Sequence, residues 1–164
     1  MKVLVSAATK HGATAEIAEA IAEVLTGRGF DVVVAPPESL SVIDDFDAAV
    51  LGSGVYFGHW LTAATDLVER STAALRARPV WLFSSGPVGE PPKPAQNPVD
   101  VSAVVEATGA REHRLFGGRI ARRTLSFSER AMVAALRVQE ADSRDWAEIR
   151  GWASAIADSL DASR

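Results

Sequence analysis

Residues 3–14 of the chain read VLVSAATKHGAT. The apolar start is typical of a buried strand, and apolar residues recur at helical spacing from Ala13 onward, so this stretch predicts strand, turn and helix. A helix start leaves backbone N–H groups without partners and carries about half a positive charge, which favours a bound anion. We therefore predict a phosphate site, with an ordinary capped turn as the alternative. Its residues would be Thr9, Lys10, His11, Gly12, Ala13 and Thr14.

The spacing within this turn separates it from the common nucleotide sites. Neither G-x-G-x-x-G nor G-x-x-x-x-G-K-[ST] occurs in the chain. A dinucleotide fold also expects an acidic residue at the end of the second strand, but the run from Asp31 to Val34 ends in Ala35-Pro36-Pro37. The sequence therefore favours a mononucleotide or an isolated phosphate.

Short apolar runs alternate with helical patterns along the whole chain. Apolar residues share one helix face in three stretches: one that begins near Ala13, one from Leu61 to Leu75, and one that begins near Asp142 or Ser143 and is expected to bury Trp146. Asn97-Pro98 predicts the start of a shorter helix ending at Gly109. Five strands are predicted, over residues 2–6, 31–35, 48–52, 80–84 and 112–117.

This alternation with short connections is typical of an α/β protein with a parallel sheet covered on both faces. We expect a three-layer sandwich with a five-stranded parallel sheet of order 2-1-3-4-5, in a single domain over residues 1–164. In such a sheet ligands bind in the crevice between strands 1 and 3, at their carboxyl ends.

Composition narrows the possible functions. The chain has 164 residues, of which 48% are hydrophobic and 23% charged, with no cysteine. Thiolate catalysis and thiolate metal sites are therefore excluded, and no cluster of His and carboxylates suggests another metal site. No apolar run is long enough to span a bilayer, and the chain begins without a signal-like segment, so we expect a cytoplasmic protein.

Charge is unevenly spread along the chain. Residues 111–137 hold seven arginines and two glutamates, although the whole chain has a formal net charge of -4. Such a run is typical of a solvated face, and an acidic partner is the alternative. Nucleic acid is not expected, because no interleaved aromatic residues or recognition motif accompany the arginines.

The loop after the third strand combines aromatic rings with glycine. Residues 52–60 read GSGVYFGHW. Flat aromatic faces can hold a flat ligand, and Gly58 allows a peptide that changes orientation. The alternatives are that the rings pack on the next helix and that His59 has a packing role. The predicted cofactor-binding residues here are Val55, Tyr56, Phe57, Gly58 and His59.

The loop after the fourth strand would form the opposite wall of the crevice. Its serine and glycine residues can offer hydrogen bonds to a polar ring edge, although a rigid surface loop is an equal alternative. His113 is interpreted as an ordinary strand residue. The predicted cofactor-binding residues in this loop are Ser84, Ser85, Gly86 and Pro87.

On these residues, the chain resembles the flavodoxin superfamily. The T-x-x-G-x-T loop at 9–14, the aromatic-glycine loop at 56–59 and the five alternating strands carry the resemblance. Within the superfamily it is most similar to the menaquinone-dependent protoporphyrinogen dehydrogenase group. The parallels include Gly117-Gly118-Arg119, an arginine-bearing segment with a helix from Ser128 to Gln139, and Asp145-Trp146 at the start of the last helix.

The resemblance implies FMN as cofactor, with its phosphate on residues 9–14 and its isoalloxazine ring between the 56–59 and 84–87 loops. It also implies that the Gly58-His59 peptide can hydrogen-bond flavin N5 in the reduced state. The chain departs from the flavodoxin pattern at His11, which stands where a hydroxyl residue is common.

Three functions stay open at this stage. The first is an FMN-dependent oxidoreductase that takes electrons from a small substrate, with protoporphyrinogen as a candidate, and passes them to a quinone or similar acceptor. The second is an electron carrier between redox proteins. The third is an interaction domain without cofactor. The 128–139 segment could face a quinone, porphyrin carboxylates or, as a peripheral contact, a membrane surface, and a core-covering helix is the favoured alternative.

Overall fold

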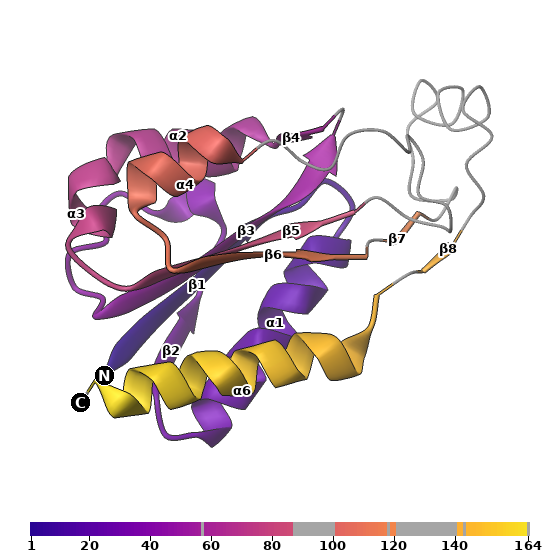
Figure 1. Cartoon of the computed structure of the whole chain (residues 1–164). Helices are drawn as coiled ribbons and strands as arrows, with labels where there is room; N and C mark the ends of the chain where they lie inside the picture. The colour runs from indigo at the N-terminus through magenta and orange to yellow at the C-terminus, as the bar shows by residue number, and fades with distance from the viewer. Residues whose placement is uncertain (57, 87–100, 118, 121–140, 143, 164) are drawn as a thin grey trace.

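Strands and helices alternate along the computed structural model (Figure 1), which describes residues 1–56, 58–86, 101–117, 119–120, 141–142 and 144–163. The strands are β1 (Lys2–Ala8), β2 (Asp31–Val34), β3 (Ala48–Tyr56), β4 (His59–Trp60), β5 (Val80–Ser85), β6 (Glu112–Phe116), β7 (Arg119–Ile120) and β8 (Ala141–Asp142). The helices are α1 (Ala13–Gly27), a 3-10 turn η1 (Pro37–Ser39), α2 (Thr62–Arg70), α3 (Thr72–Arg76), α4 (Ser102–Thr108) and α6 (Trp146–Ala162).

The five predicted strands form one parallel sheet in the order β2-β1-β3-β5-β6, which is the predicted order 2-1-3-4-5. The fold class is therefore confirmed. The short strand β4 pairs antiparallel with the end of β3, and β7 pairs with β8 in a separate two-stranded sheet. Neither of these two pairings was predicted.

Helices cover both faces of the sheet, with α1 and α6 on one side and α2, α3 and α4 on the other (Figure 1). Residues of β1 alternate between the two sides: Val3 and Val5 face α1 and α6, and Leu4 faces α2 and α3. This alternation follows from the two-residue period of a strand, and it explains why these strands are apolar almost throughout.

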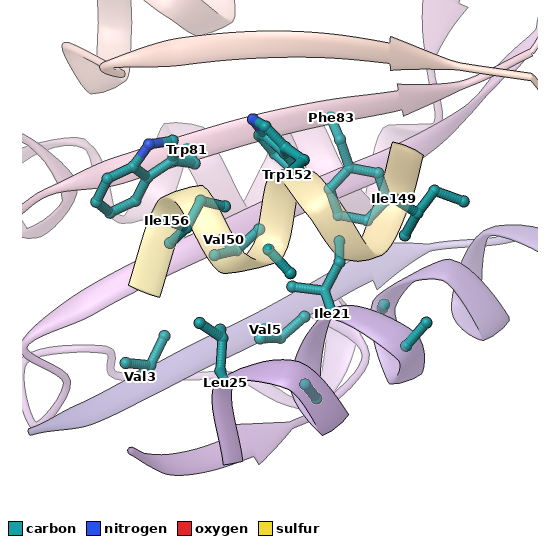
Figure 2. Packing of buried hydrophobic residues seen from close by; sticks show 14 of the residues in the cluster. Val3, Val5, Ile21, Leu25, Val50, Trp81, Phe83, Ile149, Trp152 and Ile156 are labelled. Atoms are coloured by element: carbon teal, nitrogen blue, oxygen red, sulfur yellow. The ribbon is translucent and has the colours of Figure 1, made fainter. Parts of the chain in front are cut away.

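The core under α6 is rich in aromatic rings (Figure 2). Phe83, Phe116 and Trp152 are each at most 2% exposed, and their ring centroids lie 5.4 to 6.2 Å apart. Such tilted and edge-on pairs contribute about 0.5 to 1.5 kcal/mol each beyond the area they bury. The Trp152 indole N–H also donates to Glu112 at 2.7 Å, so α6 is fixed to the edge strand β6.

Two helix predictions were wrong in their boundaries. The single helix expected from Leu61 to Leu75 is divided at Ser71, where the Thr72 hydroxyl donates to the Val68 carbonyl at 2.8 Å, a type of bond that bends helices. The last helix begins at Trp146, so the start predicted from the apolar period, near residue 142 or 143, was wrong, whereas the start at Asp145-Trp146 implied by the resemblance is confirmed. Its N-cap is Asp145, whose carboxylate accepts from the Glu148 N–H at 3.1 Å.

Trp146 was also predicted to be buried by the last helix, and this was wrong, since the residue is 36% exposed. Its ring is covered by the guanidinium of Arg144 at 4.7 Å, and it occupies the first position of α6. Apolar residues at helical spacing predict which face of a helix is buried. They do not show that a residue in the first turn extends beyond the core that this face covers.

Several predictions lie outside the described residues. They are Phe57, Gly118, Pro87, the helix start at Asn97-Pro98 and the helix predicted from Ser128 to Gln139. The predicted end of the shorter helix is confirmed, because α4 ends at Gly109 with a φ of 62°. No helix among the residues that the structure describes is both long and apolar enough to cross a membrane.

Candidate functional site

The carboxyl ends of β1, β3 and β5 lie side by side at one edge of the sheet. Ala8 of β1 pairs with Ser53 of β3, and Ser53 pairs in turn with Ser84 of β5. Each strand is followed there by one of the three predicted loops. The parallel register therefore brings together loops that are about 45 and 30 residues apart in the sequence.

The loop of residues 9–14, called here the phosphate loop, ends on the first turn of α1. The Gly12 N–H donates to the Thr9 hydroxyl oxygen at 2.9 Å. The hydrogen of the Thr9 hydroxyl takes no part in this bond and can be donated to another group. Gly12 is the N-cap of α1 at φ 90°, and no side chain caps the helix. The first-turn N–H groups of α1 are therefore available to an anion.

The end of β3 approaches the phosphate loop closely at Gly54. A Cβ atom at Gly54 would come within 3.2 Å of the Thr14 hydroxyl oxygen. Thr14 itself is only 4% exposed. The glycine thus leaves space beside a hydroxyl that lies in the first turn of α1, where an anion would bind.

Residues 55–60, called here the aromatic hairpin, extend β3 beyond its neighbours and turn back as β4. Val55 pairs with Trp60 and Tyr56 with His59, and the turn contains Gly58 at φ 79°. The Lys10 ammonium lies over the Tyr56 ring, 4.5 Å from its centroid. This contact joins the phosphate loop to the aromatic hairpin.

The third loop begins at Ser84 and closes the same edge. The Gly86 N–H donates to the Phe116 carbonyl at 2.9 Å, and Gly86 has a φ of 119°. A Cβ atom at Gly86 would lie 3.8 Å from that of Val55, so this loop lies against the base of the aromatic hairpin. All three predicted loops are therefore neighbours.

The predicted residue Ser84 is fully buried, and its hydroxyl is engaged with two side chains. It accepts from the Trp60 indole N–H at 2.7 Å and lies 2.7 Å from Nε2 of His113. His113 does lie in strand β6, as predicted, but its link to Ser84 was missed. Periodicity places a histidine on a strand face without showing which loop it reaches.

Burial lowers the pKa of His113 below its ordinary value of 6.5. When the pH falls through that value, the unfolded chain binds a proton that the folded chain still excludes. We therefore expect the free energy of unfolding to decrease from about pH 6.5 downward, until the lower folded pKa is reached.

This expectation can be measured by urea unfolding at about pH 8 and about pH 5.5. His113→Gln should reduce the loss of stability between the two conditions. His59→Gln is the control, because His59 is exposed. This variant should still show the loss of stability that is due to His113. An equal loss in His113→Gln and in the unmodified chain would contradict the prediction.

Arg144 was not predicted as a site residue, yet it lies against the phosphate loop. Its side chain is 4% exposed and donates to the Ala13 carbonyl at 3.3 Å and to the Glu16 carboxylate at 3.0 Å. It therefore ties the segment before α6 to the first turn of α1. Arg144 is 131 residues from Ala13, and no local pattern in the sequence indicates this contact.

The chain matches the family model described as "Flavodoxin domain" over residues 4–146. The chain belongs to the flavodoxin domain family. Members of this family bind FMN, so the protein is a flavoprotein, and electron transfer is its general reaction class.

Solved structures share the fold along the whole chain. An archaeal flavodoxin has a TM-score of 0.67 at 16% identity, covering 98% of this chain and 99% of that one. A flavodoxin from Streptococcus pneumonia TIGR4 has a TM-score of 0.64 at 19% identity and full coverage of both chains. Rubredoxin oxygen:oxidoreductase from Desulfovibrio gigas has a TM-score of 0.64 at 12% identity, and the match covers 98% of this chain and 36% of that protein.

One curated relative has a name that specifies a reaction. The protoporphyrinogen IX dehydrogenase [quinone] of Escherichia coli strain K12 is 27% identical over 95 residues, which are 57% of this chain and 52% of that protein. The matched region thus spans about half the length of the curated relatives.

The residues present fit the phosphate of FMN. The uncapped start of α1 offers N–H donors, the Thr9 hydroxyl hydrogen is not used within the phosphate loop, and Gly54 leaves space beside Thr14. Charged donors are also close, since Lys10 lies in the same loop and Arg144 contacts Ala13. An anion with several oxygen acceptors suits this set of donors.

Proposed function

We propose that the protein is an FMN-dependent oxidoreductase that passes electrons from a small reduced substrate to a quinone or similar acceptor. The observation that carries this proposal is the meeting of the phosphate loop, the aromatic hairpin and the Ser84 loop at the carboxyl edge between β1, β3 and β5. Bound FMN would supply the redox chemistry, by accepting two electrons and releasing them again.

The chain's own residues would hold and orient the cofactor. In this proposal, residues 9–14 bind the phosphate through backbone N–H groups and threonine hydroxyls. The aromatic hairpin and the loop from Ser84 to Pro87 lie on either side of the flavin ring. Lys10 supports the arrangement, because its ammonium lies over the Tyr56 ring and so links the phosphate loop to the aromatic hairpin.

The substrate class is supported by the curated relative, whose name specifies protoporphyrinogen IX and a quinone. We propose the same class of reaction here. In each turnover two electrons and two protons leave the reduced donor and convert one quinone into a quinol. We also propose that residues 1–164 act as a single domain, in the cytoplasm, with peripheral contact to a membrane where the quinone is dissolved.

An electron carrier between redox proteins is the second candidate. It is supported by the match to the archaeal and streptococcal flavodoxins, in which nearly the full length of both chains is covered. A carrier would perform no chemistry on a small substrate. The two functions differ in turnover and not in the cofactor.

Two measurements test the proposal. Purified protein titrated with FMN should quench flavin fluorescence, and the complex should oxidise protoporphyrinogen IX with a soluble quinone as acceptor. Binding of FMN without turnover of this donor, together with rapid reduction by a redox protein, would favour the carrier. Absence of FMN binding at high micromolar concentration would contradict both functions and leave an interaction domain.

A further inference from the structure

Three side chains from neighbouring strands form a hydrogen-bonded chain beneath the candidate flavin site. Trp60 belongs to β4 in the aromatic hairpin, Ser84 to β5 and His113 to β6. The Trp60 Nε1 to Ser84 Oγ distance and the Ser84 Oγ to His113 Nε2 distance are both 2.7 Å. Trp60 and Ser84 are 7% and 0% exposed, so water does not compete for these bonds.

The chemistry of the three groups gives the chain a direction. An indole N–H can only donate, so Ser84 accepts from Trp60. The Ser84 hydroxyl has a single hydrogen, which reaches Nε2 of His113 when that nitrogen is unprotonated. Burial lowers the pKa of His113 and favours the neutral imidazole, whose Nε2 accepts in the Nδ1–H tautomer and donates in the other. In the Nδ1–H tautomer of His113 the bonds run from Trp60 through Ser84 to His113.

The outer end of this chain fixes the aromatic hairpin. Trp60 pairs with Val55, and the adjacent pair is Tyr56 with His59, so the indole belongs to the arm of the hairpin that returns beside β3. Within the described residues, β4 has a sheet pairing only with β3. The indole bond to Ser84 thus gives the hairpin a directional attachment to β5.

We propose that Ser84 and His113 are positioning residues for the flavin: through Trp60 they fix the aromatic hairpin against the isoalloxazine ring, and so set FMN affinity and midpoint potential. The inference rests on the proposed function, because it places the ring beside this hairpin. It adds a role for a histidine on the outer strand of the sheet, whose ring nitrogen acts through two other side chains.

Packing alone is the competing explanation, since Trp60 also belongs to the apolar cluster with Ala64, Leu67 and Leu82. The two explanations attribute the effect of Ser84 and His113 to different properties of these side chains. Packing depends on volume, whereas the proposed role depends on a hydroxyl and on an acceptor nitrogen. Substitutions that change hydrogen bonding while conserving most of the volume separate them.

The test compares Ser84→Ala, His113→Leu and His113→Gln with the unmodified chain. Gln at position 113 retains an acceptor oxygen at a reach similar to that of Nε2, so it should rescue the function that Leu loses. We expect Ser84→Ala and His113→Leu to weaken FMN binding about fivefold or more and to shift the midpoint potential. His113→Gln should stay near the unmodified chain.

A double variant gives a second criterion. Ser84→Ala combined with His113→Leu should bind FMN about as well as the weaker single variant, because both changes break the same chain. Effects that simply multiply would overturn the proposal. The indole N–H resonance of Trp60 in a proton NMR spectrum should also move upfield in Ser84→Ala, since the hydrogen bond to oxygen is lost.

Thr108→Val is the matched control. Thr108 is 1% exposed and its hydroxyl donates to the Val104 carbonyl at 2.8 Å, so removal of the hydroxyl also deletes a buried hydrogen bond, but at the end of α4. It should lower the urea midpoint and leave FMN affinity and potential unchanged. If Ser84→Ala behaves in the same way, the hydrogen-bonded chain is only structural and the inference is wrong.

The outcomes separate this inference from the proposed function. If the unmodified chain binds no FMN, the proposed function fails and the positioning role fails with it. If the unmodified chain binds FMN and all three single variants bind it equally well at the same potential, the positioning role alone is wrong.

Discussion

Replacing Gly52 with alanine is expected to lower the free energy of unfolding by about 3 kcal/mol, because overpacking in a rigid core is strongly destabilising. A Cβ atom at this position in β3 would approach the end of the Phe83 ring closer than 3.0 Å. The ring cannot move aside, since Phe83 is 0% exposed and packs on Phe116 and Trp152. Urea unfolding monitored by tryptophan fluorescence measures the effect.

Gly151→Ala is the matched control for this prediction. Gly151 lies within α6, and a Cβ atom there would meet no atom within 4 Å. Alanine is favoured over glycine in a helix, so this variant should be stabilised by about 0.5 to 1 kcal/mol. Adding Phe83→Leu to Gly52→Ala should recover part of the lost stability. A Gly52→Ala variant as stable as the unmodified chain would show that the ring moves freely.

Thr14→Ala is expected to weaken FMN binding by about 1 to 3 kcal/mol, which is about 5- to 150-fold. The hydroxyl of Thr14 lies in the first turn of α1, where backbone N–H groups face the proposed phosphate position. A hydrogen bond to a charged oxygen contributes more than one between neutral groups. Quenching of flavin fluorescence during titration gives the dissociation constant.

Riboflavin provides the control, because it has the same ring and no phosphate. Its affinity should be almost the same for Thr14→Ala and the unmodified chain, and Thr14→Ser should bind FMN nearly normally. If FMN and riboflavin lose affinity equally, Thr14 supports the ring or the fold and not the phosphate. Unchanged FMN affinity would place the phosphate elsewhere.

The architecture could be predicted from the sequence because its determinants are local. Apolar runs of strand length alternate with helical periods, and right-handed crossovers then leave few possible strand orders. The glycine at position 109 ends α4 at positive φ, where glycine has no steric penalty. The three loops could be assigned to one edge for the same reason, since all of them follow parallel strands.

Contacts between distant side chains could not be predicted. Arg144 reaches Ala13 and Glu16 across more than 120 residues, and no periodicity relates these positions. The helix break at Ser71 also escaped prediction, because apolar residues continue at helical spacing across it and do not show whether the chain extends one helix or starts another. Such choices are decided by tertiary packing, which single-sequence patterns do not contain.

The roles of Ser84 and His113 show the same limit at the candidate site. The sequence indicated that Ser84 lies near a ligand, and the structure places its hydroxyl beneath the aromatic hairpin, bonded to Trp60. His113 was interpreted as a strand residue without a further role. Only the register of β5 with β6, which pairs Ser84 with Leu115 and Leu82 with His113, brings the imidazole to Ser84.

The overhang of β3 has a consequence for how this protein could be redesigned. Val55 and Tyr56 pair with Trp60 and His59 beyond Gly54 and Ser85, the last pair between β3 and β5, so the end of the hairpin does not take part in the parallel sheet. Insertions or new side chains at the tip would reshape the ligand wall while the strands below keep their alignment. Libraries at Tyr56 and His59 would therefore vary the ligand wall without changing a residue of the parallel ladder.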